Sequence, residues 1–110
     1  MTDPMMNAIE TETAKALVQA GMNGLNELVH KVSALFKRQG KFKQRYVAGE
    51  VERTLTLPQR AGGAELEFEQ ARQEAAWEVL LGELVLEHPE AVGELKTLAA
   101  EIRAALPGTQ

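Results

Sequence analysis

Residues 64–87 read AELEFEQARQEAAWEVLLGELVLE, and this stretch decides the fold class. Alanine, glutamate and leucine dominate it, and these residues favour helices. Apolar residues recur at helical spacing, which predicts one helix over residues 64–87. Residues 79–86 are apolar on nearly every side, which is typical of a deeply buried helix end. The face that we expect in the core holds Phe68, Ala71, Ala75, Val79 and Leu86, joined by Trp77, Leu80, Leu81 and Leu84.

Turn signals on both sides of this stretch separate it from further helical patterns. Downstream, His88-Pro89-Glu90 predicts a tight turn, and Pro89 suits the first position of a helix over residues 89–106. Upstream, the sequence LPQRAGG at 57–63 is the clearest break in the chain. The pattern before that break predicts a helix over residues 44–56.

The N-terminal pattern predicts one long helix over residues 5–39, about 50 Å in length. Its apolar face holds Val18, Met22, Leu25, Val29, Val32 and Phe36. Gly40 suits the left-handed residue that follows a helix end. No segment alternates with a period of two, so no sheet is expected. The sequence therefore predicts an all-α fold in one domain, residues 1–110: a four-helix bundle-like assembly with one long N-terminal helix and mostly antiparallel neighbours.

Composition excludes several classes of function. The chain has no cysteine, which removes disulfides, thiolate zinc sites and cysteine nucleophiles. Ser33 is its single serine, and nothing links Ser33 to His88 in a catalytic triad. We therefore predict no enzyme activity, no cofactor and no small-molecule substrate. No targeting segment stands out and no apolar run approaches the roughly 20 residues of a spanning helix, so we expect a cytoplasmic protein.

The net charge of −4 conceals an asymmetry between the two halves of the chain. Residues 1–60 hold nine Lys/Arg and six Asp/Glu, whereas residues 61–110 hold three and ten. Opposite charges in the two halves can attract each other within one chain or between chains.

Small residues at Ala16, Ala20 and Gly24 have the i, i+4, i+8 spacing that lets two helix backbones approach closely, and Gly21 extends this face. Glycine inside a helix costs roughly 1 kcal/mol relative to alanine, so a compensating close contact is expected. Two interpretations stay open. The face packs against another helix of the same chain, or it is a self-association surface.

A basic segment contains Lys37, Arg38, Lys41, Lys43 and Arg45, with two aromatic residues interleaved. Such a segment can bind phosphates or an anionic membrane surface. Nucleic acid is disfavoured because the pI is about 5.2 and no binding motif is present. Charge balance favours a solvated loop that pairs with the acidic helices.

Glu27 and His30 spell Glu-x-x-His, which supplies metal ligands in ferritin-like bundles. Those ligands project inward, whereas this pair lies opposite the apolar stripe of its helix. A solvated pair is therefore favoured, and we predict no metal site.

Four stretches together carry a resemblance: KALVQAG at 15–21, VSALFKR at 32–38, Trp77 followed by Leu80, Leu81 and Leu84, and PEAVGELKTL at 89–98. From residue 14 to residue 105 the pattern resembles a loose group of small helical domains found in actinobacterial proteins. The resemblance implies an all-helical module without a settled activity. Because similar modules accompany effector domains in bacterial signalling and defence proteins, it implies an adaptor or assembly role by analogy.

These observations favour a non-enzymatic module that binds a protein partner or a second copy of itself. Two alternatives remain. The first is activity at a membrane surface through the N-terminal helix and the basic segment. The second is a metal-binding, ferritin-like protein built on Glu27 and His30.

Overall fold

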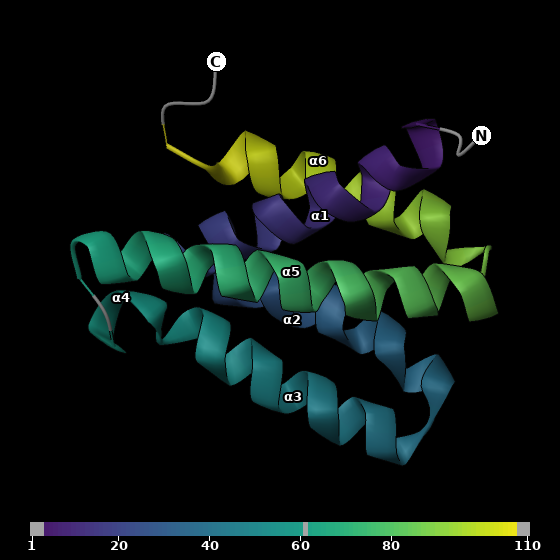
Figure 1. Cartoon of the computed structure of the whole chain (residues 1–110). Coiled ribbons are helices and arrows are strands. Elements are labelled where there is room, and N and C mark those ends of the chain that lie inside the picture. Colours follow the sequence, from purple (N-terminus) through teal and green to yellow (C-terminus); the bar gives the residue numbers. More distant parts are fainter. Residues whose placement is uncertain (1–3, 61, 108–110) are drawn as a thin grey trace.

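The computed structural model describes residues 4–60 and 62–107. Within these ranges the chain forms six α-helices and one 3₁₀ segment, with no strand (Figure 1). The all-α class is thereby confirmed, with six helices in place of the four expected. Their bounds are α1 Pro4–Met22, α2 Asn26–Ala34, η1 (3₁₀) Leu35–Gln39, α3 Lys41–Leu55, α4 Leu57–Arg60, α5 Ala64–Glu87 and α6 Ala91–Ala105.

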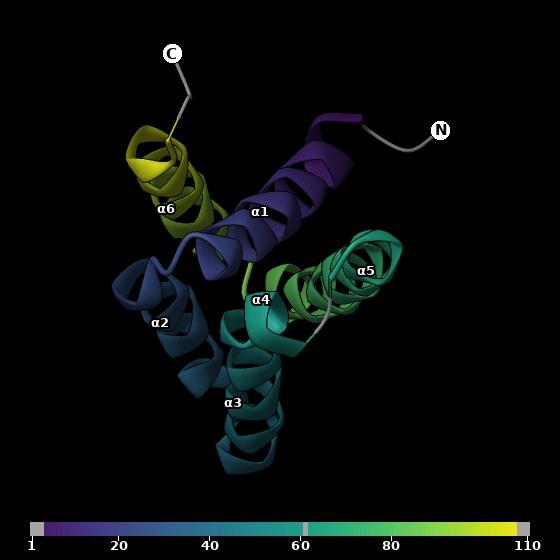
Figure 2. The same cartoon turned by 90° about the vertical axis from the view of Figure 1, so that its left-hand side faces the viewer.

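Helix α1 lies at the centre of the molecule. It packs against α5 and α6 and also contacts α2 and α3, as the end view in Figure 2 shows. Ala14, Leu17, Val18 and Ala20 are fully buried because neighbouring helices cover several sides of α1. The N-terminal helix therefore forms the core on which the other helices are arranged.

The prediction of one helix over residues 5–39 is wrong, because the chain turns at residues 23–25. Gly24 adopts a φ of 72°, in the left-handed region that favours glycine. The amide of Leu25 donates to the carbonyl of Ala20 at 2.8 Å, and the amide of Gly24 donates to that of Gly21 at 3.3 Å. This pair of bonds is the Schellman arrangement that ends a helix. Gly24 thus belongs to a turn and not to a helical packing stripe.

Helix α2 and the η1 segment return along the core and bury the apolar stripe that continues from α1. Val29, Val32 and Phe36 are fully buried. The ring centroid of Phe36 lies 6.3 Å from that of Trp77 on α5, with the planes tilted by 54°. Gly40, at a φ of 98°, follows the end of η1, as the sequence predicts.

The remaining helices agree closely with the expected ranges. Helix α3 occupies 41–55 instead of 44–56, α5 occupies 64–87 as predicted, and α6 occupies 91–105 instead of 89–106. The segment at 57–63 was expected to be a plain break, but residues 57–60 form the short α4. Leu57 is fully buried there, and its burial anchors the connection to the core.

The expected burial of α5 is only half correct. Trp77, Leu80, Leu81 and Leu84 are buried, as predicted, and Val85 joins them. The second predicted set is not in the core, because α5 is an outer helix and only one of its sides meets α1 and α6. Phe68, Ala71, Ala75, Val79 and Leu86 are all exposed.

Candidate binding groove between α3 and α5

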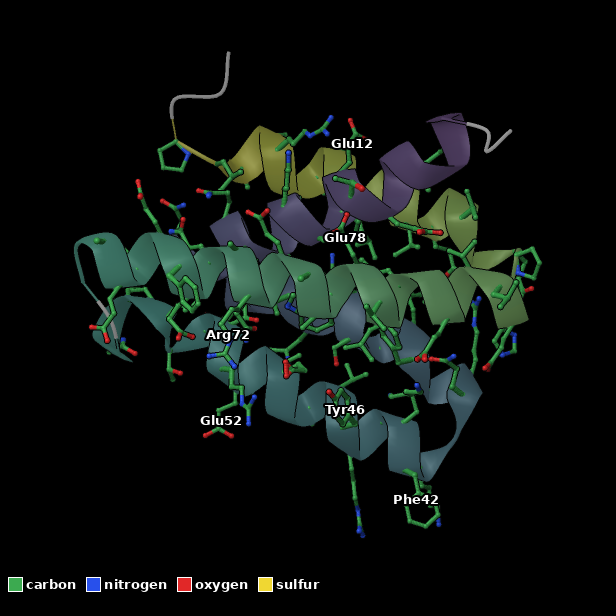
Figure 3. All side chains as sticks on the ribbon, viewed as in Figure 1. Glu12, Phe42, Tyr46, Glu52, Arg72 and Glu78 are labelled. Atoms are coloured by element: carbon green, nitrogen blue, oxygen red, sulfur yellow. The ribbon has the colours of Figure 1, made fainter. Side chains whose placement is uncertain are left out.

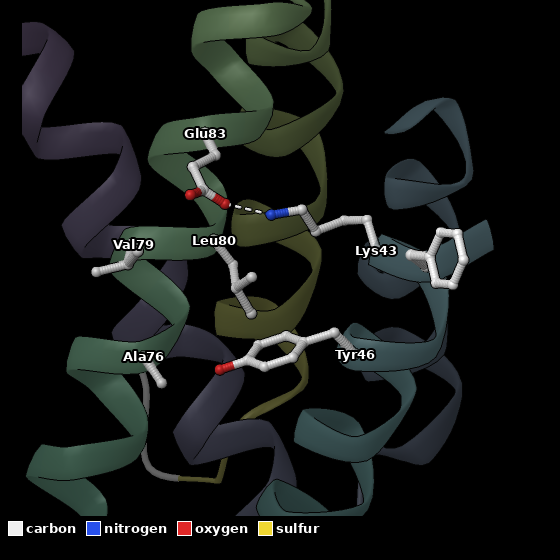
Figure 4. Close-up of a pocket in the computed structure, with 7 residues that line it drawn as sticks. Lys43, Tyr46, Ala76, Val79, Leu80 and Glu83 are labelled. Atoms are coloured by element: carbon white, nitrogen blue, oxygen red, sulfur yellow. Dashed lines mark hydrogen bonds and ion pairs between the residues drawn. The ribbon is translucent and has the colours of Figure 1, made fainter. Parts of the chain in front are cut away.

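Helices α3 and α5 run in opposite directions across one side of the molecule (Figure 1). A groove with a volume of about 470 Å³ lies between them. Its lining comes from the first half of α3 and the second half of α5: Phe42, Lys43, Tyr46, Ala76, Val79, Leu80 and Glu83. Figure 4 shows the Tyr46 ring extending from α3 toward Ala76, with Leu80 beside it. The groove is thus mainly apolar, with an ion pair at one end.

Lys43 and Glu83 form that ion pair across the groove, drawn as a dashed line in Figure 4. The Lys43 ammonium donates to the Glu83 carboxylate, and the aliphatic stem of Lys43 covers part of the groove wall. The pair ties α3 to α5 where apolar packing between them is incomplete. It also neutralises both charges before any partner approaches.

The groove continues toward α4 with a polar character. This second part has a volume of about 310 Å³, and Tyr46 and Ala76 line both parts. Its ion pairs are formed within each helix. Arg53 lies 3.7 Å from Glu50 on α3, and Arg72 lies 3.5 Å from Glu69 on α5. Figure 3 shows Arg72 extending from α5 toward the α3 side.

A buried hydrogen-bond network fixes the floor of the polar part. The Trp77 indole Nε1–H donates to the Thr54 hydroxyl at 2.9 Å. The same hydroxyl lies 2.8 Å from the Glu50 carbonyl oxygen and 2.7 Å from the Gln73 Oε1. One hydroxyl carries one proton, so it donates to one of these two oxygens at a time. Because the network joins α3 to α5 inside the protein, it sets the spacing of the groove walls.

An exposed apolar surface extends outward from the groove. We call it the α3–α5 face and define it by Phe42, Tyr46, Phe68, Ala75, Val79 and Leu86. The five large side chains of this set are exposed to 89%, 61%, 65%, 62% and 83%, in the order Phe42, Tyr46, Phe68, Val79 and Leu86. Phe42 points away from the body of the protein in Figure 3. Exposed aromatic and aliphatic side chains gathered on one surface are a feature of interaction sites.

Sequence reasoning missed this face because it assigned the α5 part to the core. The signal was nevertheless present. Residues 79–86 are apolar on nearly every side, which is more than one helix interface can cover. Apolar residues in excess of those that one interface can bury could have been interpreted as an exposed interaction surface.

The small residues of α1 lie inside the chain. Ala16 and Ala20 are buried. A Cβ on Gly21 would lie 2.5 Å from the Thr54 carbonyl oxygen, so α1 and α3 approach each other closely at Gly21. Gly24 lies in the turn and is exposed. Ala16, Ala20 and Gly21 therefore pack within the chain, which favours the first of the two open interpretations, and Gly24 takes no part in that packing.

The basic segment is divided between ion pairs and solvent. Arg38 lies 2.5 Å from Glu94 and 3.6 Å from Glu90, and Lys43 pairs with Glu83. Pairing with the acidic helices is confirmed for these two residues. Lys37, Lys41 and Arg45 are exposed, and the last two line a shallow depression on the side of α3 away from α5.

Glu27 and His30 are both exposed on α2. No group of three or more potential metal ligands occurs among the residues that the structure describes. In the same part of the chain, no helix has the length and apolar character of a membrane span. The apolar side of residues 14–36, on which the membrane-surface interpretation depended, faces the core.

We compared the chain with protein-family models, with curated proteins and with solved structures, and none of them matches it. The resemblance to small actinobacterial helical domains therefore stays a prediction.

Proposed function

We propose that this protein is a non-enzymatic interaction module that binds a protein partner through the α3–α5 face. The observation that carries the proposal is the exposure of Phe42, Tyr46 and Val79 at one groove, together with that of Phe68 and Leu86, which share the Val79 side of α5. Burying one such side chain contributes about 1.5–3 kcal/mol. A partner that covered the face would gain this stabilisation several times over, less the cost of association.

The rigidity of the groove supports the same function. Trp77, Thr54 and Gln73 hold the two helices together from inside, and Lys43 and Glu83 hold them together at the surface. A partner therefore meets walls that are already in position. Such preorganisation lowers the ordering cost that association otherwise carries.

Site-specific photo-crosslinking tests the proposal. A benzophenone amino acid replaces Tyr46, at the centre of the face. In a control it replaces Ala100, an exposed residue of α6, a helix that lies apart from α3 and α5 in Figure 2. Irradiation is carried out on the purified protein and in the source cells. We expect a crosslinked protein–protein product from position 46 and much less from position 100. Equal products at both positions, or none at position 46, would contradict the proposal.

A further inference from the structure

The exposed side of α5 repeats at the spacing of a coiled-coil seam. Its positions alternate between steps of four and three residues and read Phe68, Arg72, Ala75, Val79, Gly82 and Leu86. Each of the six is exposed or partly exposed, and the opposite side of the helix holds the buried Trp77, Leu81 and Leu84. Five of the six positions are exposed, and at Gly82 the Glu10 side chain of α1 approaches the seam from one side.

The seam is also symmetric about residue 77. Phe68 and Leu86 lie equally far from that residue, as do Arg72 and Gly82, and Ala75 and Val79. Two such helices packed antiparallel about this centre would place the large Phe68 against Leu86. The small Ala75 would meet Val79, and the stem of Arg72 would lie over Gly82, where a Cβ would be 3.5 Å from the Glu10 carboxylate of α1. In an isologous twofold interface, both copies use the same surface, so the surface must be complementary to itself. The α5 seam meets this requirement when the two helices are antiparallel.

We propose that the partner of the α3–α5 face is a second copy of this chain, with α5 packed antiparallel against α5 of that copy about a twofold axis level with Trp77. This inference rests on the proposed function, and it specifies which molecule covers the α3–α5 face. The protein is then a homodimer whose central contact is the α5 seam.

The charge distribution of α3 is consistent with the same axis. Tyr46 and Ala76 line the same stretch of groove, so the middle of α3 lies level with the middle of α5. The first turns of α3 carry the exposed Lys41 and Arg45, and its later part carries the exposed Glu52 beside the exposed Arg53. A twofold axis at the middle reverses α3 and brings the basic start of one copy toward Glu52 of the other. Lys41 or Arg45 of one copy then approaches Glu52 of the other at each end of the α3 pair.

Two of the carboxylates beside the seam already form ion pairs within each copy. Glu83 pairs with Lys43 of α3, and Glu69 pairs with Arg72 of its own helix. Since both carboxylates have a cation beside them, the repulsion between the acidic α5 helices is weakened before they meet.

The size of the face is sufficient for a stable dimer. Helix α5 has 24 residues, which corresponds to about 36 Å at 1.5 Å per residue. Two helices side by side are about 20 Å wide. Helix α3 has 15 residues, about 22 Å, so the face covers roughly 580 Å² per copy, or about 1,200 Å² for both, at the lower end of the range of specific interfaces.

Cysteine pairing tests the register, and the chain is suited to it because it has no cysteine of its own. Ala75→Cys and Val79→Cys are made as separate variants, and so are Phe68→Cys and Leu86→Cys. Under mild oxidation, we expect mixtures of the 75 and 79 variants, and of the 68 and 86 variants, to form disulfide dimers several times faster than any single variant alone. Faster pairing of each variant with itself would indicate a parallel arrangement and would overturn the inference. Ala100→Cys is the control for random collision.

The oligomeric state is measured by light scattering after size exclusion. We expect twice the 12.0 kDa mass of the chain for the wild type, and the single mass for Val79→Glu and for Leu86→Glu. Both substitutions change exposed side chains, so circular dichroism is expected to show an unchanged helix content. Ala100→Glu should stay dimeric. A wild type that is monomeric at millimolar concentration would overturn the inference. If Tyr46 then still crosslinks to a different protein, the proposed function stands without it.

Discussion

Gly21 of α1 lies so close to Thr54 of α3 that a Cβ on Gly21 would be 2.5 Å from the Thr54 carbonyl oxygen. The obstacle is backbone, which cannot move without shifting α3. We therefore expect Gly21→Ala to destabilise the fold by about 2 kcal/mol, as overpacking of a core does. Urea unfolding followed by circular dichroism measures the change, in a Val79→Glu background so that association does not contribute. A neutral or stabilised Gly21→Ala would show that the two helices separate easily.

Gly49 of α3 is the matched opposite case. It lies inside a helix, and a Cβ added there would meet no atom within 4 Å. Because alanine restricts the unfolded chain more than glycine and favours the helix, Gly49→Ala should stabilise the fold by about 0.5–1 kcal/mol. The same unfolding experiment, in the same background, gives the value. A loss of stability would contradict the open surroundings of Gly49.

Gly24 is predicted to resist substitution for a conformational reason and not a steric one. A Cβ there would meet nothing within 4 Å, yet its φ is 72°. We expect Gly24→Ala to cost about 1 kcal/mol and Gly24→Asn to cost less, because asparagine tolerates this region better. Equal costs for the two substitutions, measured by urea unfolding, would show that the turn does not depend on the backbone conformation.

The Thr54 hydroxyl is predicted to be the critical member of the buried network. Thr54→Val keeps the shape but leaves the Trp77 indole N–H without its acceptor. A buried donor without a partner costs about 1–3 kcal/mol. In a double-mutant cycle with Trp77→Phe, the two losses should be clearly less than additive, since either change removes the same bond. Strict additivity would indicate that the bond contributes nothing.

Glu10 gives the fold a pH dependence of known sign. Burial against α5 raises the pKa of this carboxyl above its ordinary value, and the nearby Glu78 charge raises it further. Thr11 donates a hydrogen bond to Glu78 at 2.7 Å, which holds this carboxylate of α5 close to α1. Since folded Glu10 binds a proton more tightly than unfolded Glu10, its contribution to stability is present at low pH and is lost as the pH rises through the raised pKa.

Glutamine at position 10 stays neutral at every pH, so Glu10→Gln removes the loss of folding stability that occurs when Glu10 becomes charged. We therefore expect the variant to melt at a higher temperature than the wild type at pH 7, with the difference shrinking as the pH falls toward 4. Thermal melts at several pH values check this, and Glu65→Gln, at an exposed position at the start of α5, is the control. A difference that grows toward low pH would contradict the raised pKa.

The three later helices could be predicted within three residues because local signals bound them. Pro89 and the glycines at 62–63 are strong local breaks, and the structure has helix boundaries beside both. The turn at 23–25 has a weaker signal. The apolar stripe of α1 continues into α2 at the same spacing, so periodicity alone joins the two helices. Whether Gly24 serves close packing or a left-handed turn depends on which neighbours are available, and a local pattern does not contain that information.

The candidate site was predictable only in part. Tyr46 and Phe42 were noticed as aromatic residues in a basic segment, and the ion pairs of Arg38 and Lys43 followed from charge balance. The role of Val79 was not foreseen. An apolar helix face looks the same in sequence whether its partner belongs to the same chain or to another one, because the hydrophobic effect does not depend on connectivity.

Trp77 is the only tryptophan in the chain, and it is fully buried beside Phe36 with its indole N–H bonded to Thr54. The protein therefore carries a built-in fluorophore whose emission reports on the interior. Unfolding should shift that emission to longer wavelength as the indole meets water. The exposed seam lies on the opposite side of α5, so covering it leaves the indole environment unchanged. One optical signal can thus follow the integrity of the core at every stage of a titration, independently of what binds outside.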